Sequence, residues 1–392
     1  MLFSLSLILI IGFSLSGLFN KLKLPGLLGM ILTGILLGPY VLNLISPEIL
    51  MISPDLREIA LIVILMRAGL SIDLSDLKKV GRPAFLMCFV PATFEILAVS
   101  LFGPKLLGIS LVEAAVLGTV LAAVSPAVIV PRMLKLMTSG HGKNKSIPQL
   151  IMAGASVDDI YVIVLFTSFL NLFKGETFSV TTLITVPLSI ITGILLGAFT
   201  GLILVKLFKR LHIRDTIKVL IILSISFLFV TLESVIKPYF PLSGLIAVMA
   251  LGGTLLKTYA LLAKRLMSKF SKIWVGAEIL LFVMVGAAVN IHALSDIGLN
   301  AFFLIFIALL FRVIGVGFSL ILTPLTIKER FFCALAYLPK ATVQAAIGAI
   351  PLSAGMPAGD TILSMAVLAI LVTAPLGALG IDLTYASFLQ KD

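Results

Sequence analysis

The sequence predicts an all-α protein that crosses a membrane many times. Of its 392 residues, 60% are hydrophobic and only 12% are charged, and the mean hydropathy is +1.21, whereas soluble domains carry about 25% charged residues. Apolar stretches of about 20 residues, the length that spans a bilayer, follow one another along the chain. We predict about thirteen spanning helices, at 2–19, 26–45, 55–72, 83–103, 111–136, 147–172, 180–205, 216–233, 241–257, 273–291, 299–323, 330–354 and 361–386.

The distribution of Lys and Arg predicts the orientation. Of the 29 Lys and Arg residues, 22 lie in the odd-numbered loops and the C-terminal tail, Lys78 and Lys79 among them. Four lie in the even-numbered loops: Arg57, Lys105, Lys174 and Lys237. Basic loops stay in the cytoplasm, so we predict an external N-terminus and a cytoplasmic C-terminus in a bacterial inner (plasma) membrane. Topology thus explains the net charge of +11, and no nucleic-acid partner is expected.

Polar features recur at a spacing of seven predicted helices. Glu95 and Arg312 each stand alone as a charge in the middle of a helix, and Pro126 and Pro339 each stand beside a polar residue in the following helix. Because seven is odd, the two halves would have opposite orientations, with helix 180–205 as a linker. This arrangement predicts two six-helix inverted-topology repeats, which are typical of secondary transporters.

Asp158 and Asp159 lie in the middle of the apolar stretch 147–172. A carboxylate at the bilayer centre costs roughly 2.5–3.5 kcal/mol. Adjacent residues on a helix point about 100° apart, so one basic partner cannot neutralise both. Two carboxylates at low dielectric repel each other, so we expect one to hold a proton near neutral pH and the pair to titrate together. This behaviour suits a site at which Na⁺ displaces H⁺.

The other charges inside predicted helices are Glu95, Arg67, Arg312 and Lys340. With the two aspartates they make three acids and three bases, a balance that we expect if these groups face one another. Ion pairs that only hold the helices together would also explain Glu95 and Arg312. Both a packing role and a transport role stay open for Arg67.

Pro126 and Pro339 predict breaks in two spanning helices. Proline removes a backbone donor and frees a carbonyl one turn back, which is tolerated at membrane depth where the backbone is buried in protein or lines a cavity. Facing half-helices would then present their dipole ends to the membrane centre. We expect Ser125 to help coordinate a cation there and Lys340 to neutralise one set of carbonyl ends. An ordinary proline kink is the alternative.

Glycines at four-residue spacing predict close helix packing. Gly193, Gly197 and Gly201 share one face of helix 180–205, and small residues at this spacing let helix backbones approach each other. They support packing and do not identify a substrate.

The function class that fits these features is a secondary transporter, not an enzyme. The chain has no Walker A motif for ATP and no TVGYG-like potassium filter. We predict an antiporter that exchanges Na⁺ (or Li⁺) for H⁺ by alternating access, needs no cofactor, and has monovalent cations, protons and the lipid bilayer as partners. A K⁺/H⁺ exchanger or K⁺ efflux system is the first alternative, and a Na⁺-coupled organic-anion symporter is the second.

Three segments together resemble the cation/proton antiporter superfamily, and most closely its Na⁺/H⁺ antiporter (NHA) branch. They are residues 122–131 (AAVSPAVIVP), 155–160 (ASVDDI) and 338–348 (LPKATVQAAIG, which includes Thr342). The resemblance implies a core of 83–172 and 299–386, in which two broken helices cross at Pro126, Pro339 and Thr342. It also implies a scaffold of 1–72 and 216–291 that forms a homodimer, and an elevator-like motion of the core.

The resemblance also implies roles for single residues. Asp159 matches the family's main ion-binding carboxylate, Asp158 matches its partner, and Lys340 matches the lysine of the crossing helices. Strongly electrogenic bacterial members carry a Lys at the position of Arg312, and that Lys pairs with the first Asp. Arginine stays protonated, so Arg312 cannot carry a proton. In the NHA branch this Arg pairs with a Glu that Glu95 matches, which implies that Asp158 is free of a salt bridge.

Overall fold

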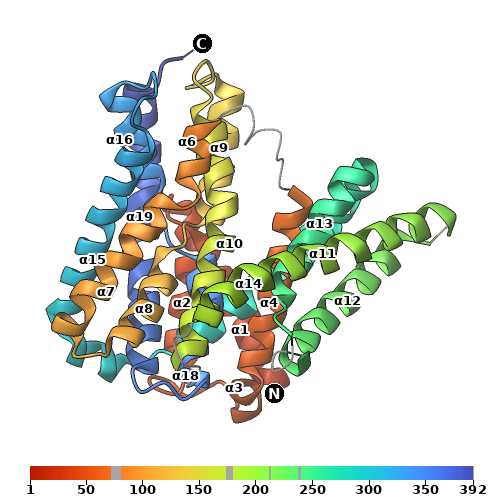
Figure 1. Cartoon of the computed structure of the whole chain (residues 1–392). Helices are drawn as coiled ribbons and strands as arrows, with labels where there is room; N and C mark the ends of the chain where they lie inside the picture. Colours follow the sequence, from red (N-terminus) through yellow and green to blue (C-terminus); the bar gives the residue numbers. More distant parts are fainter. Residues whose placement is uncertain (72–80, 174–179, 212, 237–239, 392) are drawn as a thin grey trace. The chain divides into compact units, whose positions relative to one another are not determined.

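The computed structural model describes residues 1–71, 81–173, 180–211, 213–236 and 240–391. Regular structure in these ranges is helical (Figure 1), apart from one isolated antiparallel bridge between His141 and Lys391. The predicted all-α class is therefore confirmed. The helices are α1 (Leu2–Lys21), α2 (Gly26–Leu37), α3 (Pro47–Met51), α4 (Ser53–Ser71), α6 (Arg82–Met87), α7 (Val90–Leu107), α8 (Leu111–Ala122), α9 (Pro126–Ser139), α10 (Ile147–Phe173), α11 (Val180–Arg210), α12 (Asp215–Ile236), α13 (Gly244–Thr258), α14 (Ala260–Ala287), α15 (Ile291–Ser319), α16 (Ile327–Ala336), α17 (Thr342–Ile347), α18 (Ile350–Ser353) and α19 (Gly359–Phe388).

Many of these helices have the length and composition of membrane spans. In the described part of the chain eight qualify: Leu2–Lys21, Arg82–Leu107, Ile147–Phe173, Leu188–Arg210, Asp215–Ile236, Ala260–Ala287, Gly298–Ser319 and Gly359–Phe388. Shorter apolar helices stand beside them, including α2, α8 and α13. The count of about thirteen spans, the inverted repeat and the orientation stay predictions. Four residues used for the orientation lie outside the described residues: Lys78, Lys79, Lys174 and Lys237.

Several helix bounds differ by a few residues from those predicted, and two larger differences have a physical reason. The stretch 26–45 forms a helix only to Leu37, because Gly38 and Pro39 follow and the residue before a proline disfavours helix. The helix expected to begin at 273 already begins at Ala260. Its first turns are rich in Lys and Arg. These residues form helices well but are polar, so a search for apolar stretches does not include these turns.

The two predicted helix breaks are present. α8 ends at Ala122 and α9 begins at Pro126, while α16 ends at Ala336 and α17 begins at Thr342. Pro126 stands at the first helical position, where its missing N–H costs nothing. The breaks contact each other, because the Ser125 N–H donates to the Pro339 carbonyl at 2.8 Å. Backbone groups that the breaks release from their helices are therefore paired across the two breaks.

The first of two compact units comprises Met1–Pro54, Asp73–Lys174 and Leu281–Asp392. Within it α15 packs on α7, α7 packs on α8, and α10 contacts α6, α8 and α9. A buried apolar cluster surrounds the first turns of α10, with Ile151 and Ala155 from α10 and Phe332 from α16 among its members. The aspartate pair therefore follows directly after an apolar layer along α10.

The second unit comprises Asp55–Ile72 and Gly175–Leu280, and its helices α11 and α13 pack closely. Gly193 and Gly197 of α11 lie directly against the backbone carbonyls of Ser243 and Ala247. This contact confirms the close approach that the glycine spacing predicts.

Replacing Gly197 by Ala is expected to destabilise the second unit. A Cβ at this position collides with the Ala247 carbonyl oxygen, which is backbone and cannot rotate away. Such overpacking typically costs about 1–3 kcal/mol, so the midpoint of thermal unfolding in detergent should fall. Gly276→Ala is the matched control, because Gly276 of α14 has open space around it and alanine favours helix. Equal midpoints for the two variants would contradict the close packing.

Candidate functional site

Asp158 and Asp159 are buried on α10, roughly 16 Å from its start at a rise of 1.5 Å per residue. Asp158 is 0% exposed and Asp159 is 9% exposed. One oxygen of Asp158, Oδ2, accepts hydrogen bonds from the Val124 N–H at 2.9 Å and from Arg312 Nη2 at 3.2 Å. Val124 lies in the break between α8 and α9, so its N–H is free to point at the carboxylate. The Oδ1 atoms of both aspartates have no hydrogen-bond partner among the described residues.

Arg312 of α15 is hydrogen-bonded through its guanidinium to α7, α8, α10 and the residue that follows α16. Nη1 donates to Glu95 Oε2 at 2.7 Å and also to the Ala122 carbonyl, and Nε donates to the Tyr337 carbonyl at 2.6 Å. The Arg312–Glu95 pair implied by the resemblance is thus present. The further inference that Asp158 is left without a salt bridge is wrong, because the guanidinium fork has donors enough for both carboxylates.

Lys340 lies in the second break and is 1% exposed. Its Nζ donates to Glu95 Oε2 at 2.7 Å, and its backbone N–H donates to Thr373 Oγ1 at 2.9 Å. We predicted that Lys340 neutralises carbonyl ends, but in the structure its partner is the Glu95 carboxylate. Glu95 thereby receives hydrogen bonds from two cationic side chains at once.

Arg67 has other partners. It belongs to the second unit, where its guanidinium lies 5.3 Å from the Trp274 ring centroid and interacts electrostatically with Glu278. In the described part of the chain, the hydrogen bonds of Arg312 go to other residues: Tyr337, Glu95, Ala122 and Asp158. The predicted balance of three acids and three bases is therefore replaced by three acids (Glu95, Asp158, Asp159) and two bases (Arg312, Lys340). When all five are ionised, this group carries one net negative charge.

Two hydroxyls lie beside the breaks, those of Ser125 and Thr342. Both residues are 0% exposed, and neither hydroxyl oxygen has a hydrogen-bond partner in the described part of the chain. Together with the two carboxylate Oδ1 atoms they make four buried oxygens without partners. Roughly 90% or more of buried polar groups in proteins are hydrogen-bonded, so these four oxygens are candidate ligands of an ion. Oxygen ligands of this kind suit hard cations.

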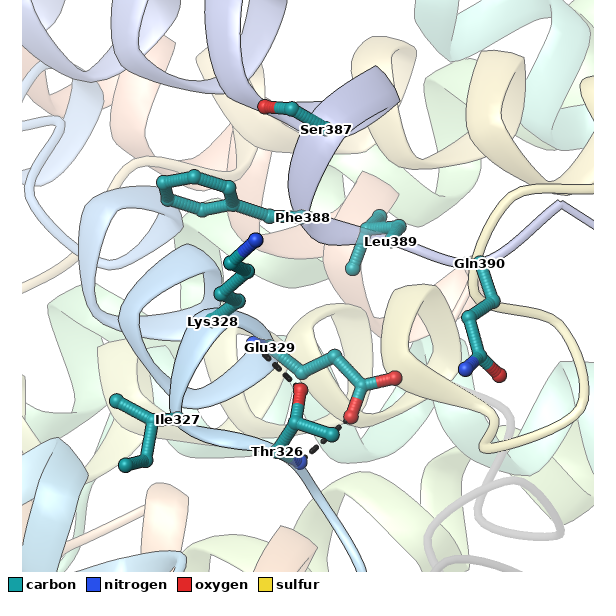
Figure 2. Close-up of a pocket in the computed structure, with 8 residues that line it drawn as sticks. All are labelled: Thr326, Ile327, Lys328, Glu329, Ser387, Phe388, Leu389 and Gln390. Carbon is teal, nitrogen blue, oxygen red and sulfur yellow. Dashed lines mark hydrogen bonds between the residues drawn. The ribbon is translucent and has the colours of Figure 1, made fainter.

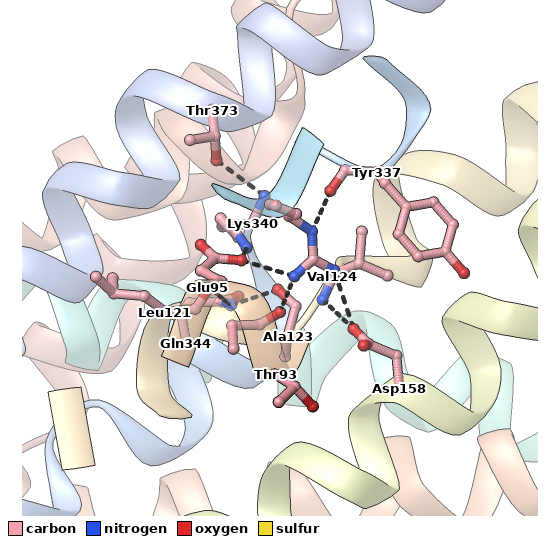
Figure 3. Close-up of polar contacts among 12 residues, drawn as sticks. Thr93, Glu95, Leu121, Ala123, Val124, Asp158, Tyr337, Lys340, Gln344 and Thr373 are labelled. Carbon is pink, nitrogen blue, oxygen red and sulfur yellow. Dashed lines mark hydrogen bonds and ion pairs between the residues drawn. The ribbon is translucent and has the colours of Figure 1, made fainter. Parts of the chain in front are cut away.

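Gln344 is a structural member of the site that sequence reasoning missed. Its Nε2 donates to the Ala123 carbonyl at 2.6 Å and to the Leu121 carbonyl at 3.3 Å, and its Oε1 accepts from the Ala341 N–H at 2.8 Å. One amide therefore satisfies backbone groups of both breaks and holds them together. Figure 3 shows its contacts with Leu121 and Ala123. The available signal was an amide side chain at predicted mid-span depth, four residues after Lys340.

A pocket of about 440 Å³ lies where α16 starts and α19 ends (Figure 2). Its lining residues are Thr326, Ile327, Lys328, Glu329, Ser387, Phe388, Leu389 and Gln390. Glu329 receives two hydrogen bonds from Lys145 Nζ, at 2.8 and 3.0 Å, and accepts from the Thr326 N–H at 2.7 Å. The carboxylate therefore ties the start of α16 to the loop before α10.

In the described residues no cluster of three or more His, Cys, Asp or Glu side chains could hold a metal ion.

Replacing Glu329 by Gln is expected to destabilise the protein at neutral pH. Burial by itself raises the pKa of Glu329, but hydrogen bonds from Lys145 and Thr326 outweigh it and hold the pKa below the usual 4.5. A lowered folded-state pKa contributes stability that is present above the unfolded pKa and is lost as the pH falls through the folded pKa. We expect a loss of about 1–2 kcal/mol at pH 7. Unfolding midpoints measured from pH 7 downward should converge for wild type and variant below the folded pKa, and a pH-independent difference would contradict this. Glu48→Gln, at an exposed position, is the control.

Comparison with known proteins identifies the family. The sequence model described as "Sodium/hydrogen exchanger, transmembrane" matches residues 5–384. The chain belongs to the sodium/hydrogen exchanger family. It is 33% identical over 380 residues to sodium/hydrogen exchanger 9B2 of Mus musculus, covering 94% of this chain and 69% of that protein. It is 34% identical over 385 residues to sodium/hydrogen exchanger 9B2 of Homo sapiens, covering 94% and 70%.

A solved structure shows the same fold. It is that of the sodium proton antiporter MjNhaP1 from Methanocaldococcus jannaschii at pH 8, with a TM-score of 0.80 at 22% identity, covering 97% of this chain and 95% of that one. Membership of the sodium/hydrogen exchanger family confirms the resemblance to cation/proton antiporters. The protein is therefore a membrane transporter that exchanges a cation for protons.

Proposed function

We propose that this exchanger transports Na⁺ (or Li⁺) against H⁺, and that Asp158 and Asp159 form the site that the two ions share. The observation that carries the proposal is the charge of the buried network. Among the described residues, Glu95 and Asp158 form ion pairs with the two bases Arg312 and Lys340, and Asp159 adds a third acid beside them, which leaves one negative charge. One proton or one Na⁺ neutralises it, and a buried uncompensated charge is costly. Competition between proton and cation for one charge is the requirement for exchange.

The unpartnered oxygens support a cation as the second occupant. Asp158 Oδ1, Asp159 Oδ1 and Ser125 Oγ are buried and make no hydrogen bond within the described ranges. We assign these three residues as ligands of the transported Na⁺, which is cargo and not a resident cofactor. Pro126, Pro339 and Thr342 are assigned to the breaks that open the backbone beside it.

The proposed motion follows from where the network lies in the sequence. Every charged member of the network belongs to 83–172 or 299–386, the segments assigned to the core. We propose that this core moves in an elevator-like alternating-access cycle against a scaffold of 1–72 and 216–291, with 180–205 as the linker and with a homodimer formed through the scaffold. The proposed setting is a bacterial inner (plasma) membrane, with the N-terminus outside and the C-terminus in the cytoplasm.

The test is a cation series in proteoliposomes that hold a pH gradient. A pulse of Na⁺ or Li⁺ should collapse the gradient in vesicles with wild-type protein and leave it intact in vesicles with Asp159→Asn. Collapse by K⁺ alone would replace the Na⁺ assignment with K⁺/H⁺ exchange. Uptake of Na⁺ that needs an organic anion and moves few protons would replace antiport with symport. Running the series with and without a clamped membrane potential shows whether the exchange moves net charge.

A further inference from the structure

Tyr337 is a fully buried tyrosine that contacts Arg312 twice. It follows the last residue of α16, so its carbonyl is released by the helix break and accepts a hydrogen bond from Arg312 Nε at 2.6 Å (Figure 3). Its ring centroid lies 5.5 Å from Arg312 Cζ, within the range of a cation–π interaction. Tyr337 is therefore one of the residues that position the guanidinium.

The other end of the same side chain presses on α10. The Tyr337 hydroxyl lies directly against Gly154, where a Cβ would collide with it, and Met87 closes the same space at 2.9 Å from that Cβ. Residues four apart share one face of a helix, so Gly154 is on the face of α10 that carries Asp158. Tyr337 thus spans the gap between Arg312 and the Asp158 side of α10.

The hydroxyl oxygen contributes length and no hydrogen bond. It has no partner among the residues that the structure describes, and its surroundings are the apolar cluster that includes Ile151, Ala155 and Phe332. An unsatisfied buried hydroxyl costs free energy that phenylalanine would avoid. The feature that distinguishes Tyr from Phe here is therefore the spacing that the oxygen imposes.

That spacing bears on the ion site. Arg312 donates to Tyr337 at 2.6 Å and to Glu95 at 2.7 Å, but to Asp158 only at 3.2 Å. Of the four oxygens that Arg312 hydrogen-bonds, Asp158 Oδ2 is the most distant. A transported cation must compete with Arg312 for the Asp158 carboxylate. The closer the guanidinium lies to this carboxylate, the more strongly the two attract each other, and the more weakly the cation binds.

We propose that Tyr337 is a positioning residue of the exchange cycle, a spacer between α16 and α10 that keeps Arg312 at the edge of hydrogen-bond range from Asp158. It thereby sets the affinity of the site for the transported cation. The inference rests on the proposed function, because it takes Asp158 as a cation ligand. It adds a determinant of cation affinity that itself makes no contact with the cation.

The test uses two substitutions of opposite effect. Tyr337→Phe removes the spacing oxygen and lets Asp158 approach Arg312, so KM for Na⁺ should rise about fivefold, with kcat changing less. Gly154→Ala adds a methyl group at the same contact and pushes α10 away, so KM should fall. In the double variant the methyl group occupies the space that the oxygen leaves, and KM should return toward wild type.

A control variant and the contradicting outcomes complete the test of the spacer role of Tyr337. Tyr385→Phe, whose ring packs on His141, is the control for losing a tyrosine hydroxyl elsewhere in the same unit. A Tyr337→Phe protein that melts at a different temperature but keeps the wild-type KM would overturn the proposal, as would a double variant that does not compensate. If Gly154→Ala does not fold, Tyr337→Phe and the double variant still decide. If wild type transports another cation, the proposed Na⁺ function fails, and the same KM comparison is made with that cation.

Discussion

Replacing Arg312 by Gln is expected to lower the free energy of unfolding by about 3–5 kcal/mol, the cost of leaving buried charges without their partner. Glu95 and Asp158 both accept hydrogen bonds from this guanidinium, and both are buried. Lys340 still reaches Glu95, but no other basic side chain is hydrogen-bonded to Asp158 in the described structure. The measurement is thermal unfolding in detergent. We expect the variant to have a much lower unfolding midpoint than wild type, or to be lost at expression.

A second substitution tests whether the instability of Arg312→Gln comes from buried acids that have lost their basic partner. In Arg312→Gln/Glu95→Gln one acid is removed with the base, so part of the stability should return. Arg132→Gln is the matched control, because its ion pair with Asp382 is at the surface, with exposures of 21% and 43%. Exposed pairs contribute only about 0–1 kcal/mol. An Arg312 variant no less stable than the Arg132 variant would show that the network does not hold the core together.

Asp158→Asn and Asp159→Asn are expected to abolish exchange alike but to affect stability in opposite ways. Asp159 makes no ion pair with any residue that the structure describes, and its replacement leaves two acids against two bases, a neutral group. It also removes the repulsion from Asp158, so the unfolding midpoint of Asp159→Asn should equal or exceed that of wild type. Asp158→Asn replaces the ion pair with Arg312 by a weaker interaction. The free energy of unfolding should fall by about 2 kcal/mol, which is typical of a hydrogen bond to a charged group.

The measurement pairs the pH-gradient assay with thermal unfolding of the same preparations. Asp382→Asn, which removes an exposed carboxylate, should preserve both exchange and stability. Equal destabilisation by the two site substitutions would mean that Asp159 has a partner that offsets its charge. Exchange that survives in Asp159→Asn would remove this residue from the site.

The sequence predicted the elements of this fold well wherever the determining pattern is local. Stretch 147–172 corresponds to α10 (Ile147–Phe173), and 361–386 corresponds to α19 (Gly359–Phe388). Hydrophobicity over about 20 residues marks a span, and Pro126 and Pro339 mark the breaks because a missing N–H disrupts a helix in any context. The predicted bounds were wrong where a local signal was weaker, as at Gly38 and Pro39.

By itself, then, the sequence determined the helical membrane class, the two breaks and the buried aspartate pair, and its motifs identified the family. The resemblance implied the Arg312–Glu95 pair, but only the tertiary structure decided that Arg312 also pairs with Asp158 and that Lys340 pairs with Glu95. Arg312 lies 217 residues from Glu95 and 154 from Asp158 along the chain, and Arg67, equally polar in the sequence, faces Trp274 instead. The physical reason is that an ion pair needs two groups within about 3 Å, a distance set by how helices pack. The patterns that form each helix extend only over its own turns.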